Sequence, residues 1–265
     1  MSKIKIMSNR RRLLGQLGAG VSLVALGGCD IFDGMLGTGD PVRNFLQKAN
    51  VLTKDAQRAI QGPMPMAPEY PASAIREGQR PNGSTDPQTG DYLAVKKDGF
   101  AGYRLQVTGL VDKPLSLSLD ELRAMPSRTQ ITRHDCVEGW SCIAQWTGVQ
   151  LSRVLDQAGI KPAARYVVFR CYDSLGNTLS GPAIYYESID LISARHPQTI
   201  LAYGLNGQTL PIANGAPLRV RIEQQLGYKM AKYIRAIEIV DSFAKIDGGN
   251  GGYWEDQGYD WYAGS

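Results

Sequence analysis

The stretch RHDCVEGWSC, Arg133 to Cys142, holds two of the chain's four cysteines and one of its two histidines. Thiolates and imidazoles bind metals and act as nucleophiles in catalysis. Residue type alone therefore leaves four interpretations of Cys136: a buried core thiol, half of a disulfide, a nucleophile or a metal ligand. The rest of the sequence narrows this choice.

The composition indicates a globular protein. The 265 residues are enough for one good-sized domain or two small ones, and 43% hydrophobic with 20% charged residues suits a folded core rather than disorder. The formal net charge of +4 is mild, and no long basic run follows the N-terminus. We therefore expect no nucleic-acid partner.

The first 28 residues have the pattern of an export signal. A basic region at 3–12 precedes an apolar stretch at 13–26, which is shorter than the roughly 20 residues that span a bilayer. Arg10 and Arg11 in NRRRLL predict twin-arginine export to the periplasm, with an ordinary secretory signal as the alternative. LGGC predicts a lipid anchor at Cys29, with plain signal cleavage as the alternative.

The other cysteines and the histidines set limits on the chemistry of Cys136. Cys136, Cys142 and Cys171 are an odd number, which weakens a disulfide in an exported protein without excluding it. Structural zinc is disfavoured because the chain has no C-x-x-C and no H-x-x-x-H pair. His134 remains a candidate base for a cysteine hydrolase, since alternate residues of a strand share a face.

The order of predicted elements indicates an α+β domain. A helical pattern at 40–60 is followed by a proline- and glycine-rich segment at 61–99, which we expect to be extended or looped. Ser118 and Glu121 have capping-box spacing for a short helix, and Leu151 to Ala158 is an amphipathic helix that Gly159 ends. Strands are predicted at 103–107, 127–132 (running into a loop at RHDC), 165–173, 217–222 and 233–241.

Four ordered motifs identify a family. They are CVEGW (136–140), QWTGVQLSRVLDQAG (145–159), NGAPLRVRI (214–222) and GYKMAKYI (227–234). Together they closely resemble the molybdopterin-binding domain of the sulfite oxidase superfamily. The nearest branch contains the exported catalytic subunit of the periplasmic methionine sulfoxide reductase. The resemblance covers residues 103–241 and implies a single α+β, mixed-sheet domain of sulfite oxidase type without a separate dimerisation domain.

The resemblance also implies one molybdenum–molybdopterin cofactor per chain. Cys136 falls on the position of the family's metal-binding thiolate, and a soft thiolate suits a metal held by dithiolene sulfurs. Lys232 is a further candidate for the cofactor's phosphate. The family's cofactor-contacting positions correspond to Cys171, Asn214, Arg219, Gly227, Tyr228 and Lys229.

The chain departs from the family pattern in ways that bear on substrate. Cys171 stands where the compared relative has a threonine, and that relative's upstream asparagine and Phe-Tyr contacts have no counterpart here. The arginine-rich surroundings of true sulfite oxidases are missing, and Glu138 would repel sulfite. Glu138 and His134 are candidate catalytic residues beside Cys136. Glu138 could equally be a solvated loop carboxylate, and an ordinary hydrogen-bonded core or loop histidine is the favoured interpretation of His134.

These observations predict an exported oxidoreductase that transfers an oxygen atom and thereby reduces a sulfoxide or a similar small oxide. The chain has no haem or iron–sulfur motif, so electrons would come from a membrane haem-b protein or a soluble cytochrome. Alternatives are a lipid-anchored binding module without turnover, and a sulfite-oxidising dehydrogenase. We expect a monomer with an export signal (1–28), an N-terminal helix and extended segment (29–98), the cofactor domain (99–243) and a docked aromatic tail (244–265).

Overall fold

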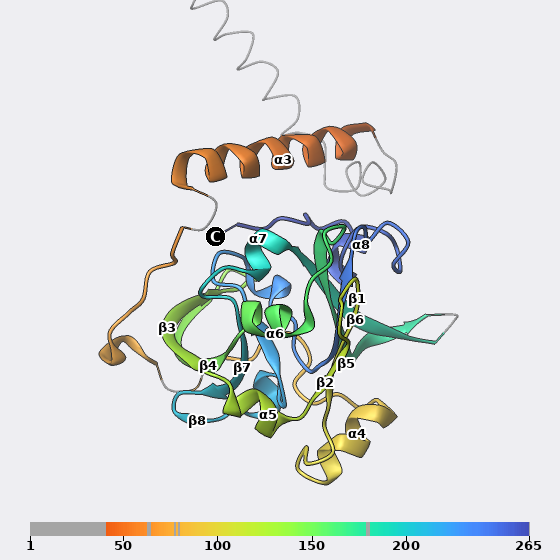
Figure 1. Ribbon diagram of the computed structural model, residues 1–265. Helices are drawn as coiled ribbons and strands as arrows, with labels where there is room; N and C mark the ends of the chain where they lie inside the picture. Colours follow the sequence, from red (N-terminus) through yellow and green to blue (C-terminus); the bar gives the residue numbers. More distant parts are fainter. Residues whose placement is uncertain (1–40, 63–64, 77, 79, 179–180, 265) are drawn as a thin grey trace, which may run out of the picture. The chain divides into compact units, whose positions relative to one another are not determined.

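The computed structural model describes residues 41–62, 65–76, 78, 80–178 and 181–264 (Figure 1). The chain divides into two compact units, Met1–Asn50 and Val51–Ser265, and helix α3 (Pro41–Gln61) begins in the first and ends in the second. The predicted export signal, with its arginine pair and Cys29, lies outside the described residues. Within the described ranges, no helix is long and apolar enough to cross a membrane.

Five strands form a mixed sheet in the order β2-β1-β10-β5-β6. β1 and β10 run parallel, and every other neighbouring pair in this sheet is antiparallel. In β1 the side chains of Leu105 and Val107 alternate inward, as a half-buried strand requires. The strands are β1 (Leu105–Gly109), β2 (Leu115–Leu117), β5 (Tyr166–Thr178), β6 (Gly181–Asp190) and β10 (Ile234–Val240).

A second sheet is antiparallel throughout, in the order β3-β4-β7-β8, with β9 also paired to β7. The inward face of β3 is polar, because Gln130, Thr132 and His134 are its buried side chains. Buried polar groups need hydrogen-bond partners, so this face predicts a polar network inside the protein. The strands are β3 (Ser127–Asp135), β4 (Ser141–Gln150), β7 (Ile200–Leu205), β8 (Gln208–Thr209) and β9 (Arg219–Arg221).

The main hydrophobic core lies between the two sheets. It joins Val107 and Phe169 of the first sheet to Leu201 and Val220 of the second, with one face of helix α6 between them (Figure 1). Helix α6 (Leu151–Ala158) buries its apolar stripe there and ends at Gly159, whose φ is +67°. The other helices are α4 (Gly90–Lys97), α5 (Leu119–Ala124), α7 (Leu191–Ala194), α8 (Tyr253–Asp256) and the 3₁₀ turns η1 (Ala72–Ala74), η2 (Ile212–Asn214) and η3 (Gly227–Lys229).

The α+β fold, the capping box and the amphipathic helix are confirmed, and two local predictions are wrong. Residues 133–135 continue strand β3 instead of forming a loop, because they pair with residues 141–143 of β4. Residues 90–97 form helix α4 instead of an extended segment. Burial of Tyr92, whose hydroxyl donates to the Ala216 carbonyl at 2.9 Å, stabilises this helix through a contact distant in sequence.

The capping box of α5 gives the first prediction. Ser118 Oγ accepts from the Glu121 amide at 3.1 Å, and the Glu121 carboxylate accepts from the Ser118 amide at 2.7 Å. Ser118→Ala should therefore lower the free energy of unfolding by about 1 kcal/mol, measured by urea denaturation. Ser127→Ala, at an exposed serine outside the cap, should change it by less than about 0.5 kcal/mol. Equal effects of the two substitutions would show that the cap contributes nothing.

Candidate functional site

Cys136 lies in a tight turn between two neighbouring strands. β3 ends at Asp135 and β4 begins at Ser141. The Cys136 amide donates to the Trp140 carbonyl at 2.9 Å, and the Gly139 amide donates to the Cys136 carbonyl at 3.0 Å. Gly139 has a φ of +82°, which glycine adopts without a steric penalty. The turn therefore holds Cys136 at one end of the sheet, where only 8% of it is exposed.

Cys136 lines a pocket of about 220 Å³. The other walls come from the segment before α4, from β5 and β6, from the residues around η3, and from the C-terminal tail. The pocket therefore brings together parts of the chain that are far apart in sequence. Five of the predicted site residues line it: Cys136, Glu138, Gly227, Tyr228 and Lys232.

Burial and the neighbouring charges have opposing effects on the pKa of the Cys136 thiol. The pKa of the thiol is raised overall, mainly by burial and further by the charge of the Glu138 carboxylate, while hydrogen bonding from the Glu138 amide and the charge of Arg80 act against this rise. The Glu138 carboxylate is exposed at the pocket, accepts from Trp140 Nε1 at 2.8 Å and lies 3.8 Å from Arg80. The carboxylate is therefore accessible to solvent and to a substrate that enters the pocket.

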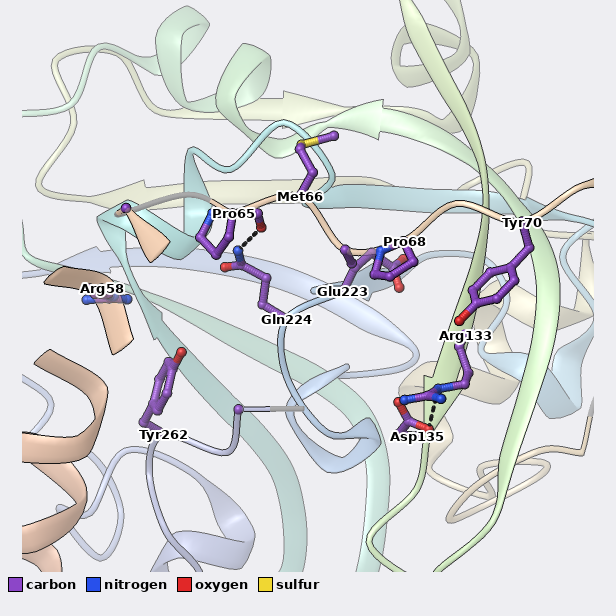
Figure 2. A pocket seen from close by; sticks show the side chains of 13 residues that line it. Arg58, Pro65, Met66, Pro68, Tyr70, Arg133, Asp135, Glu223, Gln224 and Tyr262 are labelled. Atoms are coloured by element: carbon purple, nitrogen blue, oxygen red, sulfur yellow. Dashed lines mark hydrogen bonds and ion pairs between the residues drawn. The ribbon is translucent and has the colours of Figure 1, made fainter. Parts of the chain in front are cut away.

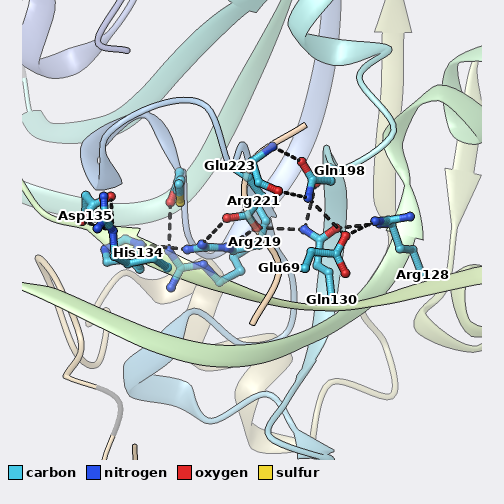
Figure 3. A network of polar contacts seen from close by, with 12 residues as sticks. Glu69, Arg128, Gln130, His134, Asp135, Gln198, Arg219, Arg221 and Glu223 are labelled. Atoms are coloured by element: carbon cyan, nitrogen blue, oxygen red, sulfur yellow. Dashed lines mark hydrogen bonds and ion pairs between the residues drawn. The ribbon is translucent and has the colours of Figure 1, made fainter. Parts of the chain in front are cut away.

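His134 is buried behind the turn and does not line the pocket (Figure 3). Its Nδ1 accepts from Arg221 Nη1 at 2.7 Å, and its Nε2 has no hydrogen-bond partner among the described residues. Burial and the neighbouring charge of Arg221 lower the pKa of His134 well below its usual value. The ring is therefore neutral, and it packs against Gly227, where a Cβ atom would lie 2.5 Å from Nε2.

Arg219 and Asn214 are buried, and Arg219 Nη2 donates to the carbonyl of the pocket residue Met230 at 3.4 Å. Arg219 Nη1 donates to the Asn214 carbonyl at 2.9 Å, and its guanidinium stacks over the Trp146 ring at 4.9 Å. Burial, followed by the charge of Arg221, lowers the pKa of Arg219 to about 9. Its Nε lacks a partner in the part of the chain that the structure describes. Neither Asn214 nor Arg219 lines the pocket.

The three residues of the GYK motif (227–229) have two different environments. Gly227 and Tyr228 line the pocket, whereas the side chain of Lys229 is buried between two carboxylates. Lys229 Nζ donates to Glu187 Oε1 and to Glu255 Oε1. Both carboxylates raise the pKa of Lys229 against the effect of burial, so the lysine stays charged. In this structure Lys229 anchors the tail that carries Glu255, and its predicted contact to the cofactor stays a prediction.

Lys232 and Cys171 have contrasting positions. Lys232 lines the pocket, where burial, followed by the charge of Arg219, lowers its pKa to about 7. Its Nζ donates to the Ser84 carbonyl and to the Ala213 carbonyl, the latter at 3.1 Å. Cys171 is fully buried in the main hydrophobic core, where burial raises the pKa of its thiol.

Sequence reasoning missed several pocket residues, among them Ser84, Asp173, Trp254 and Tyr259. Asp173 lies two positions after Cys171 on β5, but Cys171 packs in the core while Asp173 lines the pocket, so strand alternation gave no usable signal for Asp173. No spacing signal marks the others, because Ser84 comes from the proline- and glycine-rich segment and the two aromatic residues come from the tail. Their part in the site depends on tertiary structure alone.

A larger cavity of about 410 Å³ lies at the end of β3 (Figure 2). Arg133 and Asp135 line it, and they form an ion pair at 2.9 Å. Gln224 and Tyr262 reach it from other segments. None of the predicted site residues lines this cavity, so the smaller pocket at Cys136 is the better candidate site.

Comparison with known proteins agrees with the site. A family described as "Oxidoreductase molybdopterin binding domain" matches residues 92–245. The chain belongs to this family. It is therefore a molybdopterin-dependent oxidoreductase, as the motifs predicted.

Two similar proteins have names that describe an activity. A protein of Azospira oryzae, provisionally named protein-methionine-sulfoxide reductase subunit YedZ1, is 39% identical over 91% of this chain and 85% of its own length. The protein-methionine-sulfoxide reductase catalytic subunit MsrP of Xanthomonas campestris pv. campestris is 38% identical over 59% of this chain. The chain spans about half the length of the MsrP relatives, 49% in this case.

Among solved structures, the sulfane dehydrogenase SoxCD of Paracoccus pantotrophus is similar at 25% identity and a TM-score of 0.46. That match covers 53% of this chain and 38% of the SoxCD chain.

The residues of the pocket fit a molybdopterin. Within the described residues, no three or more His, Cys, Asp or Glu side chains converge as a metal site. A metal on Cys136 would therefore bring its other ligands with it, as a dithiolene cofactor does. Lys232, whose pKa burial lowers to about 7, would supply a cation for the cofactor's phosphate when protonated, and the pocket also holds the buried carboxyl group of Asp173. The roles of the individual residues stay predictions.

The close contact between Gly227 and His134 gives the second prediction. Gly227→Ala should lower the free energy of unfolding by about 1–3 kcal/mol, because the new Cβ would force the buried ring to move. Thermal unfolding of the purified protein measures this. Gly90→Ala is the control, since a Cβ there meets nothing within 4 Å. A Gly227→Ala protein as stable as the control would mean that His134 does not hold this wall.

Proposed function

We propose that this molybdopterin oxidoreductase carries molybdenum and transfers an oxygen atom, in the direction that reduces a sulfoxide. The observation that carries the proposal is the position of Cys136, a nearly buried thiol that lines the same pocket as Lys232. The names of the Azospira and Xanthomonas relatives, both protein-methionine-sulfoxide reductase subunits, support a sulfoxide as the substrate class.

The surface around the pocket supports an uncharged substrate. The Glu138 carboxylate is exposed there and lies 3.8 Å from the Arg80 guanidinium, so the pair presents no net positive charge that would attract an anion such as sulfite. Val137 and Tyr259 also line the pocket and are exposed apolar side chains. A neutral sulfoxide with apolar substituents would lose little solvation energy on entering such a site.

The chain's own residues would bind and orient the cofactor. When bound, the cofactor supplies the two-electron chemistry of oxygen-atom transfer. Cys136 would hold the metal, while Lys232 would hold the phosphate. Sulfoxide reduction also consumes protons, and Glu138 lies beside solvent, where it can exchange them. Trp254 and Tyr259 form the wall of the pocket that comes from the tail.

The proposal extends to location and partners. The twin-arginine pattern at Arg10 and Arg11 supports export of a folded, cofactor-loaded protein to the periplasm. A membrane haem-b protein or a soluble periplasmic cytochrome would supply electrons, and a lipid on Cys29 would hold the protein at the membrane. We propose that the catalytic unit works as a monomer on a small-molecule substrate.

The third prediction compares two thiols that lie close together in sequence. Cys136→Ser should abolish reduction of a small sulfoxide by reduced viologen dye, because a hydroxyl replaces the thiolate that binds the metal. The pterin should remain, since residues other than Cys136 hold it. Cys142→Ser should keep most activity, because Cys142 lies on β4 and does not line the pocket. Dye-linked turnover, molybdenum content and the Mo(V) paramagnetic resonance signal measure these effects.

Two outcomes would overturn the proposal. Wild-type protein from a molybdenum-replete, pterin-competent host could contain zinc alone or no metal. Alternatively, Cys136→Ser could keep the wild-type turnover and Mo(V) signal. Stoichiometric molybdenum without sulfoxide turnover would refute the substrate class and leave the metal assignment standing.

A further inference from the structure

The part of helix α3 that belongs to the unit Val51–Ser265 exposes its apolar side chains. Leu52, Ala56 and Ile60 are spaced four residues apart, so they lie along one side of the helix and form what we call the α3 stripe. Ile60 is 85% exposed and Leu52 71%, the highest values for large apolar side chains in the part of the chain that the structure describes. Ala56 is exposed as well. A surface helix normally buries such a stripe against the core, so this exposure needs an explanation.

Two cationic side chains hold the opposite side of α3 on the rest of the unit. Lys54 follows the first residue of the α3 stripe by two positions, which turns it about 200° around the helix axis, and Arg58 lies one turn further on. Arg58 Nη1 forms an ion pair with Asp190 Oδ2 at 2.8 Å, and its guanidinium lies over the Tyr262 ring at 5.6 Å (Figure 2). Lys54 Nζ lies over the Trp261 ring at 5.5 Å. The usual arrangement is therefore inverted, with the charged side docked and the apolar side exposed.

The contacts of Arg58 fix the rotation of the helix about its axis. Its partner Asp190 is also the N-cap of α7, where it accepts from the Ser193 amide at 2.8 Å. Arg58 Nη2 donates to Ser193 Oγ at 3.4 Å. Only 17% of the Arg58 side chain and 15% of the Lys54 side chain are exposed. Turning the α3 stripe toward the domain would break these contacts, so the stripe is available to bind something else.

The place of α3 in the chain indicates what covers the α3 stripe. Residues 30–40 connect Cys29, the proposed site of a lipid anchor, to Pro41, the first residue of the helix. Such a segment spans at most about 40 Å when fully extended, so a lipid on Cys29 would keep the helix near the bilayer. A single lipid chain gives only marginal membrane binding, and stable attachment takes a second contact. An exposed apolar helix face is a contact of this kind.

We propose that the α3 stripe binds the surface of a lipid bilayer. The helix lies in the plane of the membrane, with the stripe at the boundary between the headgroups and the acyl chains. Trp261 and Tyr262, which hold the helix, belong to the same C-terminal tail that forms one wall of the Cys136 pocket. The contact therefore keeps the catalytic unit at the membrane, where the proposed haem-b partner supplies electrons. The proposal rests on the proposed membrane location and is independent of the sulfoxide substrate.

The test measures binding of the cofactor-loaded mature chain, residues 29–265, to protein-free vesicles of phosphatidylethanolamine and phosphatidylglycerol. Made without its export signal, this chain carries no lipid, so co-sedimentation reports the protein's own affinity. The variants are Leu52→Ser, the double substitution Leu52→Ser with Ile60→Ser, and Ala56→Leu. Leu93→Ser, at a leucine that is 41% exposed on α4, is the matched control. None of these substitutions changes the charge, so a purely electrostatic attraction to anionic lipid would be equal for all of them.

The double variant should bind vesicles at least about tenfold more weakly than the unsubstituted chain, because it removes the two large apolar side chains of the stripe. Leu52→Ser should have an intermediate affinity, and Leu93→Ser should match the unsubstituted chain. Ala56→Leu should bind more tightly, because it adds apolar area to the stripe. A gain in binding cannot come from a failure to fold. Circular dichroism and dye-linked turnover confirm that each variant is folded and loaded with cofactor.

Two results would overturn the proposal. One is a folded double variant that binds vesicles as well as Leu93→Ser does. The other is an unsubstituted chain that does not bind protein-free vesicles, which would leave an apolar groove of a partner protein as the occupant of the stripe. If the double variant does not fold, Ala56→Leu decides, and unchanged binding of that variant would equally overturn the proposal. Mass spectrometry of the exported protein tests the lipid on Cys29 separately, so a missing anchor and a missing α3 contact are distinguishable.

Discussion

The buried guanidinium of Arg221 connects two strands that are not neighbours in their sheet. β9, which carries Arg221, pairs with β7, whereas β3 lies beyond β4. Arg221 forms an ion pair with Glu223 at 2.6 Å and donates to His134 Nδ1 at 2.7 Å (Figure 3). The ion pair with Glu223 holds the Arg221 guanidinium in place, and the hydrogen bond to His134 joins it to the end of β3. The Cys136 turn follows directly from that end.

The pocket depends on segments that lie outside the family domain. Ser84 precedes residues 92–245, and Trp254 and Tyr259 follow them. The tail is held by the buried pair of Lys229 with Glu255 and by the Tyr228 hydroxyl, which donates to the Asp260 carbonyl at 2.7 Å. The GYK motif therefore shapes the site in two ways. Its backbone forms one wall, and the Lys229 side chain holds another wall in place.

Residue spacing and backbone preference correctly predicted those features of the fold that depend only on residues close together in the sequence. The capping box at Ser118 and the end of α6 at Gly159 follow from spacing and backbone preference. The thiol of Cys136 was assigned to the site from its motif, and the pocket confirms that it faces a cavity. Its role as a metal ligand stays a prediction.

Other features could not be predicted, because their partners are distant in sequence. Lys229 contacts Glu187, 42 positions away, and no local pattern relates the two. Asp173 lines the pocket beside an irregularity in β5, where simple alternation no longer fixes the direction of side chains. The central claim concerns the bond between Cys136 and the metal, and X-ray absorption at the molybdenum edge tests it most directly. The account predicts that Cys136→Ser holoprotein has one sulfur neighbour of molybdenum fewer than wild type; an unchanged number of sulfur neighbours would contradict it.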